Sequence, residues 1–300
     1  MSRIINLGII GSSEGNGHPY SWSAIFNGYN KKIMENCGYP SIPRYLEKQK
    51  FPNDQIKEAK VTHIWTQNKK LSKHISRASK IKNVVNNMDD LISKVDAILL
   101  ARDDAENHFK MSKKFLKAGL PIFIDKPMTL SVLEASKLFN LQKYEGQIFS
   151  CSAMRYAPEI KLTQKQKEKI GKIKFIYGYI SNSWDKYAIH LIEPILKLIP
   201  NRGNIINHNV LHFYDKTSLS INFESRVSIQ VNTFGKSLSP FYLRVIGTNG
   251  LIDIFFKDTF KAFKASLKDF VEGIINKDVR IKSNSIIEII KLLELGRKIR

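Results

Sequence analysis

The chain has 300 residues, a length that suits one large or two ordinary domains with a real hydrophobic core. An apolar fraction of 43%, with no signal sequence and no bilayer-length apolar run, predicts a cytoplasmic protein that spans no membrane. The net charge of +21 comes from lysines spread along the whole chain, without any nucleic-acid-binding motif, so we expect no specific nucleic-acid partner. The two cysteines and seven histidines show no metal-ligand spacing, and we expect no metal site.

Residues 4–10 form an apolar run that predicts a buried strand, and a glycine-rich turn follows. Ser21 is expected to cap a helix that starts near Trp22. Strand, glycine turn and helix are the context in which main-chain N–H groups bind a dinucleotide pyrophosphate. The fingerprint is irregular, because Ser13 and Asn16 stand at the second and third glycine positions. The predicted cofactor contacts in this turn are Gly11, Ser12, Ser13, Gly15 and Asn16.

His18 ends the turn and is either a surface side chain or a group that approaches the pyrophosphate or the substrate. Residues 36–60 interrupt the strand–helix rhythm and are expected to be an insertion folded over the first βα unit, as decoration, lid or oligomer contact. The strand at residues 61–65 is followed by Thr66 and Gln67, where an NAD enzyme carries an acid for the ribose. With no acid there and lysines nearby, either NAD or NADP is allowed.

Residues 95–101 are the clearest buried strand, and a dense polar segment follows it. Arg102, Asn107 and His108 are candidates for shaping a cofactor site there, although His108 could equally serve as a simple helix cap. A helix is predicted from Asn107 to Ala118, ending at Gly119.

Residues 121–124 predict another buried strand, which ends at Asp125-Lys126-Pro127. Pro127 biases Lys126 toward an extended conformation, and the bond between them is a candidate cis peptide. Ligands of a parallel sheet collect beyond the carboxyl ends of its strands, so Lys126 is a candidate for chemistry. The alternative is a surface turn with a solvated lysine.

Alternating strands and helices predict a doubly wound parallel Rossmann sheet of the α/β class over residues 1–152. The second half predicts an α+β domain over residues 153–300, with an open, mostly antiparallel meander of strands at residues 173–181, 210–214, 218–223, 227–233 and 242–247. Helices are expected over residues 187–199, 260–275 and 285–299. The uncovered face of this sheet predicts a homodimer or homotetramer.

In the order and spacing of its motifs the chain resembles the glucose–fructose oxidoreductase, inositol dehydrogenase and MocA (Gfo/Idh/MocA) family. The resemblance covers essentially the whole length. It rests on the Gly8-Ile9-Ile10-Gly11 start, on Asp125-Lys126-Pro127 in place of Glu-Lys-Pro, and on His190 in the first C-terminal helix. Further support comes from residues 101–108, 154–156 and 246–250.

The resemblance implies an NAD(P)-dependent oxidoreductase that moves a hydride between nicotinamide and a sugar, cyclitol or sugar-derivative alcohol or ketone. Lys126 would touch the nicotinamide ribose and the reacting hydroxyl, beside Asp125, and His190 would be the general acid/base. The reverse assignment of base and electrostatic group stays open. The family's acid four residues before the histidine is here Lys186, so Asp185, Tyr187 or a distant group would orient His190.

The implied substrate contacts are His18, Arg155, Tyr156 and Lys186, although Arg155 and Tyr156 could equally belong to a solvated linker. The alternative function is a non-catalytic dinucleotide-binding sensor or scaffold on the same fold, and the departures at Ser13, Asn16 and Lys186 motivate it.

Overall fold

The computed structural model describes residues 3–297, and the chain divides into two compact units. The first contains residues 1–129, 133–151 and 263–287, and the second contains residues 130–132, 152–262 and 288–300. The boundary expected at residue 152 is therefore incomplete, because residues 263–287 return to the first unit. Phe270 in this segment explains the return, since its ring lies 5.6 Å from the rings of Phe123 and of Phe149 in the first sheet.

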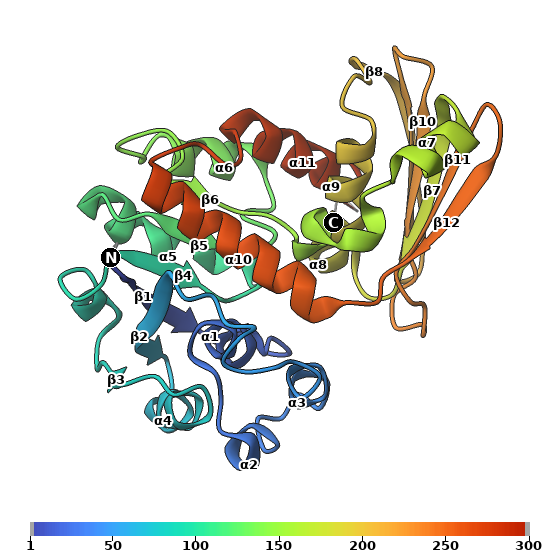
Figure 1. The fold of residues 1–300 in the computed structure, drawn as a ribbon. Helices are drawn as coiled ribbons and strands as arrows, with labels where there is room; N and C mark the ends of the chain where they lie inside the picture. Colours follow the sequence, from blue (N-terminus) through green and yellow to red (C-terminus); the bar gives the residue numbers. More distant parts are fainter. Residues whose placement is uncertain (1–2, 298–300) are drawn as a thin grey trace. The chain divides into compact units, whose positions relative to one another are not determined.

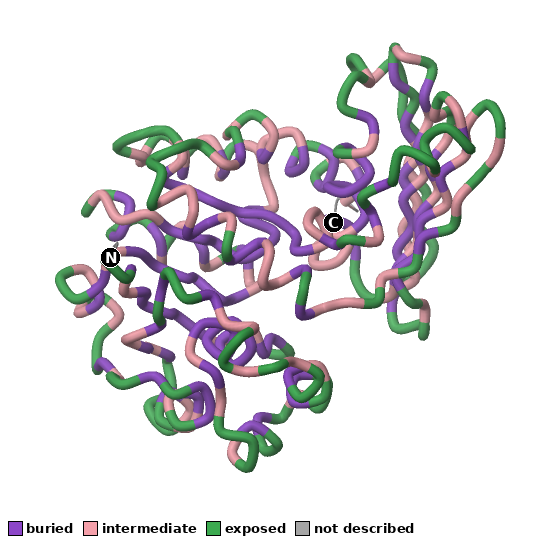
Figure 2. The backbone as a smooth tube through the Cα atoms, in the orientation of Figure 1, coloured by how far each residue is buried: buried purple, intermediate pink, exposed green. Residues whose placement is uncertain are grey.

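The first unit is built on a six-stranded sheet in the order β3-β2-β1-β4-β5-β6, with every pair parallel (Figure 1). The predicted Rossmann sheet is confirmed. Four of its strands, β1, β4, β5 and β6, are almost wholly buried (Figure 2), as expected for a sheet with helices on both faces. The strands are β1 (Ile5–Gly11), β2 (Ala59–Thr66), β3 (Asn83–Val84), β4 (Ala97–Leu100), β5 (Ile122–Ile124) and β6 (Ile148–Phe149).

The strand order reverses at β1, which pairs with β2 on one side and β4 on the other. In such sheets the ligand crevice lies beyond the carboxyl ends of the strands at this switch point. The segments that follow β1, β2, β4 and β5 are those in which the sequence predicted cofactor residues.

The helices of the first unit include α1 (His18–Asn27), which begins earlier than expected. Its N-cap is Gly17, and Pro19 lies in the first turn, where a missing N–H costs no hydrogen bond. Ser21 is therefore inside the helix and does not cap it, and its buried hydroxyl hydrogen-bonds the carbonyl of His18. The others are α2 (Lys31–Met34), α3 (Ser41–Leu46), α4 (Lys69–Ala78), η1 (Met88–Leu91), α5 (Ala105–Ala118) and α6 (Val132–Phe139).

The second unit contains a six-stranded sheet in the order β12-β11-β7-β10-β9-β8. It is mostly antiparallel, as predicted, but it is not a simple meander, because the first strand, β7, lies in the middle and pairs with β10 in parallel. The strands are β7 (Ile173–Ile180), β8 (Ile205–Phe213), β9 (Lys216–Phe223), β10 (Ser228–Thr233), β11 (Tyr242–Gly247) and β12 (Leu251–Phe255).

The helix predicted over residues 187–199 is two helices, α8 (Trp184–Tyr187) and α9 (Ile189–Leu198), which meet at Ala188. This break places His190 in the first turn of α9. The remaining elements are η2 (Ala153–Tyr156), η3 (Pro158–Ile160), α7 (Gln164–Ile170), α10 (Thr259–Asn276) and α11 (Ser283–Leu295). The last helix was predicted to run to Ile299, but α11 ends at Leu295, since Gly296 and Arg297 are not helical; residues 298 and 299 lie outside the described residues.

Within residues 3–297, no helix combines the length and apolar character needed to cross a membrane. In the same range, no group of three or more His, Cys, Asp or Glu side chains is arranged to hold a metal ion. Cys37 and Cys151 are buried free thiols.

Candidate functional site

The glycine turn after β1 is packed tightly at its start and open in its middle. A Cβ atom at Gly11 would lie 2.3 Å from Cγ of Pro19. The start of α1 therefore packs against Gly11 so closely that a side chain at this position would clash. Gly15 has φ +77°, and a Cβ atom there would meet nothing within 4 Å. The tip of the turn therefore presents bare backbone to open space.

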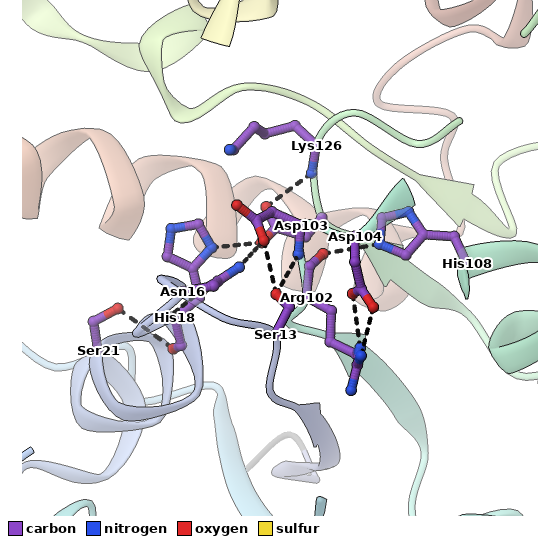
Figure 3. A network of polar contacts seen from close by, with 10 residues as sticks. Ser13, Asn16, His18, Ser21, Arg102, Asp103, Asp104, His108 and Lys126 are labelled. Atoms are coloured by element: carbon purple, nitrogen blue, oxygen red, sulfur yellow. Dashed lines mark hydrogen bonds and ion pairs between the residues drawn. The ribbon is translucent and has the colours of Figure 1, made fainter. Parts of the chain in front are cut away.

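A buried carboxylate, that of Asp125, links this turn to the end of β5. Its partners Asn16, His18 and Lys126 are labelled in Figure 3. Asp125, 1% exposed, accepts from Asn16 Nδ2 at 3.0 Å and from His18 Nδ1 at 2.5 Å through its Oδ2. Its Oδ1 accepts from the main-chain N–H of Lys126 at 2.8 Å. The side chain of Asn16 also accepts from the N–H of His18 at 2.7 Å. One carboxylate therefore fixes the turn, the start of α1 and the backbone at Lys126.

Burial by itself would raise the pKa of Asp125, but His18, Lys126 and the Asn16 hydrogen bond together hold it below its ordinary value. The carboxylate is ionised at neutral pH and only accepts, so His18 Nδ1 donates. The His18 ring stacks on Trp22, with centroids 5.0 Å apart and planes at 12°, and meets Phe263 edge-on. His18 is thus a fixed member of the turn and not a loose surface side chain.

The Lys126–Pro127 peptide bond is cis, as the sequence suggested. Lys126 is only 6% exposed, which excludes the alternative of a solvated lysine in a surface turn. The main-chain N–H of Lys126 is hydrogen-bonded to the Asp125 carboxylate, and the charge of Lys126 helps to lower the pKa of Asp125.

The end of β4 carries a second ion pair, between Arg102 and Asp104. Arg102, 7% exposed, donates through Nε at 2.8 Å and through Nη2 at 2.5 Å to the two oxygens of Asp104. Asn107 Nδ2 donates to the same carboxylate at 2.7 Å. Burial would raise the pKa of Asp104, but the hydrogen bonds from Arg102 and Asn107 outweigh it and lower the pKa. Arg102 and Asn107 are thus brought together, through an acid to which the sequence assigned no role.

Gln67, which follows β2, also contacts Arg102 and links it to the glycine turn. Its Oε1 accepts from Arg102 Nη1 at 3.0 Å and from the N–H of Ser12 at 3.2 Å, and its Nε2 donates to the Ser12 carbonyl at 2.7 Å. The predicted cofactor residues Gln67, Ser12 and Arg102 therefore contact one another. Thr66 is buried, and its hydroxyl is hydrogen-bonded to the Asn68 carbonyl and the Ser72 hydroxyl. These bonds stabilise the chain where β2 ends.

His108 is fully buried, and its two ring nitrogens face the carbonyl oxygens of Met128 at 2.9 Å and of Arg102 at 2.8 Å. The ring thus joins the segments that follow β4 and β5. Ser13 is bound to Asp103, a residue that the sequence did not single out, by a hydrogen bond of 2.7 Å between their side chains. The insertion also reaches the turn, since a Cβ atom at Gly17 would lie 2.6 Å from Ile42 and 2.8 Å from Tyr39.

In the second unit, His190 is the centre of a separate polar cluster. Its Nδ1 lies 2.7 Å from the hydroxyl oxygen of Ser152, a fully buried residue that also caps η2 by accepting from the N–H of Met154. The Tyr187 ring meets the His190 ring edge-on at 5.4 Å. Ser152 was not among the predicted residues, because a lone serine after a strand carries no recognisable signal.

Glu193, one turn after His190 on α9, is the most buried acid of this cluster at 1% exposure. It accepts from the N–H of Ser152 at 2.6 Å and from Arg155 Nη1 at 3.2 Å. Burial raises the pKa of Glu193 to about 7, although Arg155 and the Ser152 N–H act against the rise. Arg155 is thus tied to α9 and does not belong to a solvated linker.

Three further predicted residues of the second unit are Asp185, Tyr156 and Lys186. Asp185 is ion-paired with Arg297, whose Nε lies 3.0 Å from its carboxylate. Lys197 Nζ lies 5.5 Å from the centroid of the Tyr156 ring and donates to the Arg155 carbonyl at 3.0 Å. Lys186 is part of the short helix α8.

A dinucleotide fits the polar cluster of the first unit, around the glycine turn. Within residues 3–297, the main-chain N–H groups of Ser13, Glu14 and Gly15 have no hydrogen-bond partner, and they lie just before the start of α1. Such amides at a helix N-terminus are suited to a phosphate group. The residues that would hold the group are those of the turn, with Gln67 and Arg102 along the neighbouring strand ends.

The first unit thus has a Rossmann fold with an open glycine turn, and the second is an added α+β unit. Residues 36–152 match the family model described as "Oxidoreductase family, NAD-binding Rossmann fold". This match confirms the predicted resemblance to the Gfo/Idh/MocA family over residues 36–152.

One curated relative is the uncharacterized oxidoreductase YhhX of Escherichia coli (strain K12), which is 26% identical over 187 residues. The match covers 56% of this chain and 53% of YhhX, so the chain spans about half the length of that relative.

Solved structures resemble the whole chain. Scyllo-inositol dehydrogenase from Lactobacillus casei has a TM-score of 0.73 at 15% identity, with 98% of this chain and 95% of that chain covered. UDP-N-acetylglucosamine 3-dehydrogenase GnnA from Acidithiobacillus ferrooxidans has a TM-score of 0.72 at 13% identity, with 99% and 97% covered. At these identities the likeness establishes the shared fold.

The raised pKa of Glu193 predicts a pH-dependent stability. Between its ordinary value of 4.5 and about 7, the folded state binds more protons than the unfolded state, so the stabilising contribution is lost as pH rises through this window. The slope is at most about 1.4 kcal/mol per pH unit. Glu193→Gln should remove this slope, so its stability relative to wild type, measured by urea unfolding at pH 5 and pH 8, should rise with pH. The exposed Glu168→Gln in the same unit is the control, and parallel pH profiles for wild type and Glu193→Gln would contradict the assignment.

Proposed function

We propose that this chain is an NAD(P)-dependent oxidoreductase that transfers a hydride between nicotinamide and a CH–OH group of a sugar, cyclitol or sugar derivative. The observation that carries the proposal is the buried Asp125–Lys126 pair, tied to the glycine turn at the switch point of the sheet. It brings the dinucleotide-binding backbone and a cation into one cluster. The family match and the dehydrogenases with the same fold support this reading.

When bound, the dinucleotide supplies the hydride acceptor or donor. Lys126 holds positive charge where the alkoxide develops, and its burial strengthens this stabilisation because little water screens it. Asp125 and the cis bond to Pro127 orient the backbone that carries the ammonium.

His190 takes the hydroxyl proton in oxidation and returns it in reduction, through Nε2, because its Nδ1 is occupied by Ser152. Imidazole suits this exchange because its ordinary pKa is near neutrality. Tyr187 packs against the ring and limits its rotation. Arg155, Tyr156 and Lys186 are proposed substrate contacts in the same unit, and His18 is one in the first unit.

The second candidate is a dinucleotide-binding sensor or scaffold without turnover. The absence of an acid four residues before His190 favours it, since Lys186 stands there and Asp185 pairs with Arg297. A thermal-shift comparison of NAD and NADP, followed by polyols and nucleotide sugars added to the stabilised protein, separates the two. Nicotinamide reduction with any of these substrates supports the enzyme, and dinucleotide binding without turnover over the whole panel supports the sensor.

Lys126→Ala should leave dinucleotide binding within a few-fold of wild type and lower turnover about 100-fold or more, because a charge-stabilising group is lost. Binding is measured by thermal shift and turnover by nicotinamide absorbance. The control is Lys110→Ala, an exposed lysine on α5. Turnover equal to that of wild type would remove Lys126 from the reaction.

His190→Ala should abolish the limb of the kcat/KM profile near neutral pH, because the group that exchanges the proton is gone. The profile is measured between pH 5 and pH 9 with the same substrate. Persistence of the limb would assign the proton transfer to another group.

The second sheet supports the proposal of a homodimer or homotetramer. A Cβ atom at Gly178 would touch Leu191 of α9 at 3.1 Å, so Tyr177 and Tyr179 point to the opposite face. There the Tyr179 ring lies 4.8 Å from Tyr242, and Tyr242 lies 5.2 Å from Phe255, which is 48% exposed. A partly exposed aromatic cluster on an open sheet face is a candidate subunit interface.

Light scattering should therefore give two or four times the chain mass of 34.5 kDa. Tyr177→Lys, which puts a charge into this face, should shift the mass toward the monomer, whereas Lys174→Glu at an exposed position should not. A wild-type monomer at tens of micromolar would refute the proposed interface.

A further inference from the structure

Three groups were expected as the partner that orients His190, and two of them, Asp185 and Tyr187, lie on the short helix before it. Asp185 is ion-paired with Arg297. Tyr187 meets the His190 ring with its edge, at 5.4 Å between centroids and 71° between planes, which is a packing contact. The hydrogen-bond partner at Nδ1 is distant in sequence, since Ser152 Oγ lies 2.7 Å away and 38 residues earlier.

Ser152 is held so that its hydroxyl has little freedom. Its side chain is fully buried, and its Oγ accepts from the N–H of Met154 at 3.1 Å as the N-cap of η2. Its main-chain N–H donates to Glu193 on α9, three residues after His190 and on the same helical face. The serine is thus attached to α9 by two independent hydrogen bonds, one from its backbone and one from its side chain.

The hydrogen-bond capacity of a serine suits both states of an acid/base histidine. As a base, His190 must carry its proton on Nδ1 and expose the lone pair of Nε2, and as an acid it carries protons on both nitrogens. Nδ1–H donates in both states, and the serine oxygen accepts from it and from Met154 with its two lone pairs. A neutral hydroxyl can therefore hold the ring throughout a proton-transfer cycle.

We propose that Ser152 is the positioning residue for His190 and replaces the acid that is missing at position 186. The inference rests on the proposed function, because it assumes that His190 exchanges the proton. Ser152 does not touch the reacting atoms. It fixes the direction of Nε2 and holds the proton of the productive tautomer on Nδ1.

Two substitutions distinguish the contribution of the Ser152 hydroxyl from that of its main chain. Ser152→Ala removes the hydrogen bonds of Oγ to His190 and Met154 and keeps the main-chain bond to Glu193, and Ser152→Thr keeps the hydroxyl as well. Thr163→Ala is the control for the loss of a helix cap alone. Thr163 caps α7 in the same unit through its Oγ1, and it contacts no histidine among the described residues.

The first readout needs neither cofactor nor substrate. Imidazole ¹⁵N signals of the full chain are recorded, and those of His190 are identified by their loss in His190→Asn. In Ser152→Ala the His190 nitrogens should shift toward a different tautomer ratio, whereas Ser152→Thr and Thr163→Ala should resemble wild type. Unchanged His190 signals in Ser152→Ala would overturn the proposal.

The second readout is kinetic. Ser152→Ala should lower kcat about 10-fold to 100-fold, part of the contribution of a positioned acid/base group, with KM changed little and the pH profile displaced. Ser152→Thr should recover most of the loss. Equal kcat values and pH profiles for Ser152→Ala and wild type would also refute the role. If wild type shows no turnover, the proposed function fails, and the ¹⁵N signals still decide whether Ser152 orients His190.

Discussion

The first unit depends on one buried carboxylate. Asp125 gathers donors from Asn16, His18 and the backbone of Lys126, and so it joins the glycine turn to the end of β5. A buried carboxylate without partners would be neutralised, but these donors keep the pKa of Asp125 low and the side chain charged. Lys126, whose main-chain N–H is one of these donors, is itself only 6% exposed.

Side-chain hydrogen bonds replace sequence features that the chain lacks. The glycine fingerprint is irregular at positions 13 and 16. The side chains at these positions form hydrogen bonds, Ser13 with Asp103 and Asn16 with Asp125. In the second unit, the acid expected before His190 is absent, and Ser152 provides the hydrogen bond to its ring. Each of these departures from the family pattern is therefore accompanied by a specific side-chain contact.

Local patterns in the sequence were enough to predict the Rossmann sheet and the open second sheet, because strand and helix periods are short-range signals. They failed at the start of α1, where Pro19 in the first turn outweighed Ser21 as a cap. They also failed to predict the central place of β7, which depends on pairing with a strand far along the chain. The partners of Asp125 and His190 lie 107 and 38 residues away, and no periodicity reports such contacts.

The central claim is that Asp125 organises a dinucleotide site, and calorimetric titration with NAD and NADP tests it most directly. Wild type should bind at least one of them saturably. Asp125→Asn, with the fold verified by circular dichroism, should bind about 10-fold or more weakly, because an amide cannot accept from Asn16, His18 and the Lys126 N–H at once. Equal affinity of the two proteins, or no binding of either dinucleotide to wild type, would contradict the account.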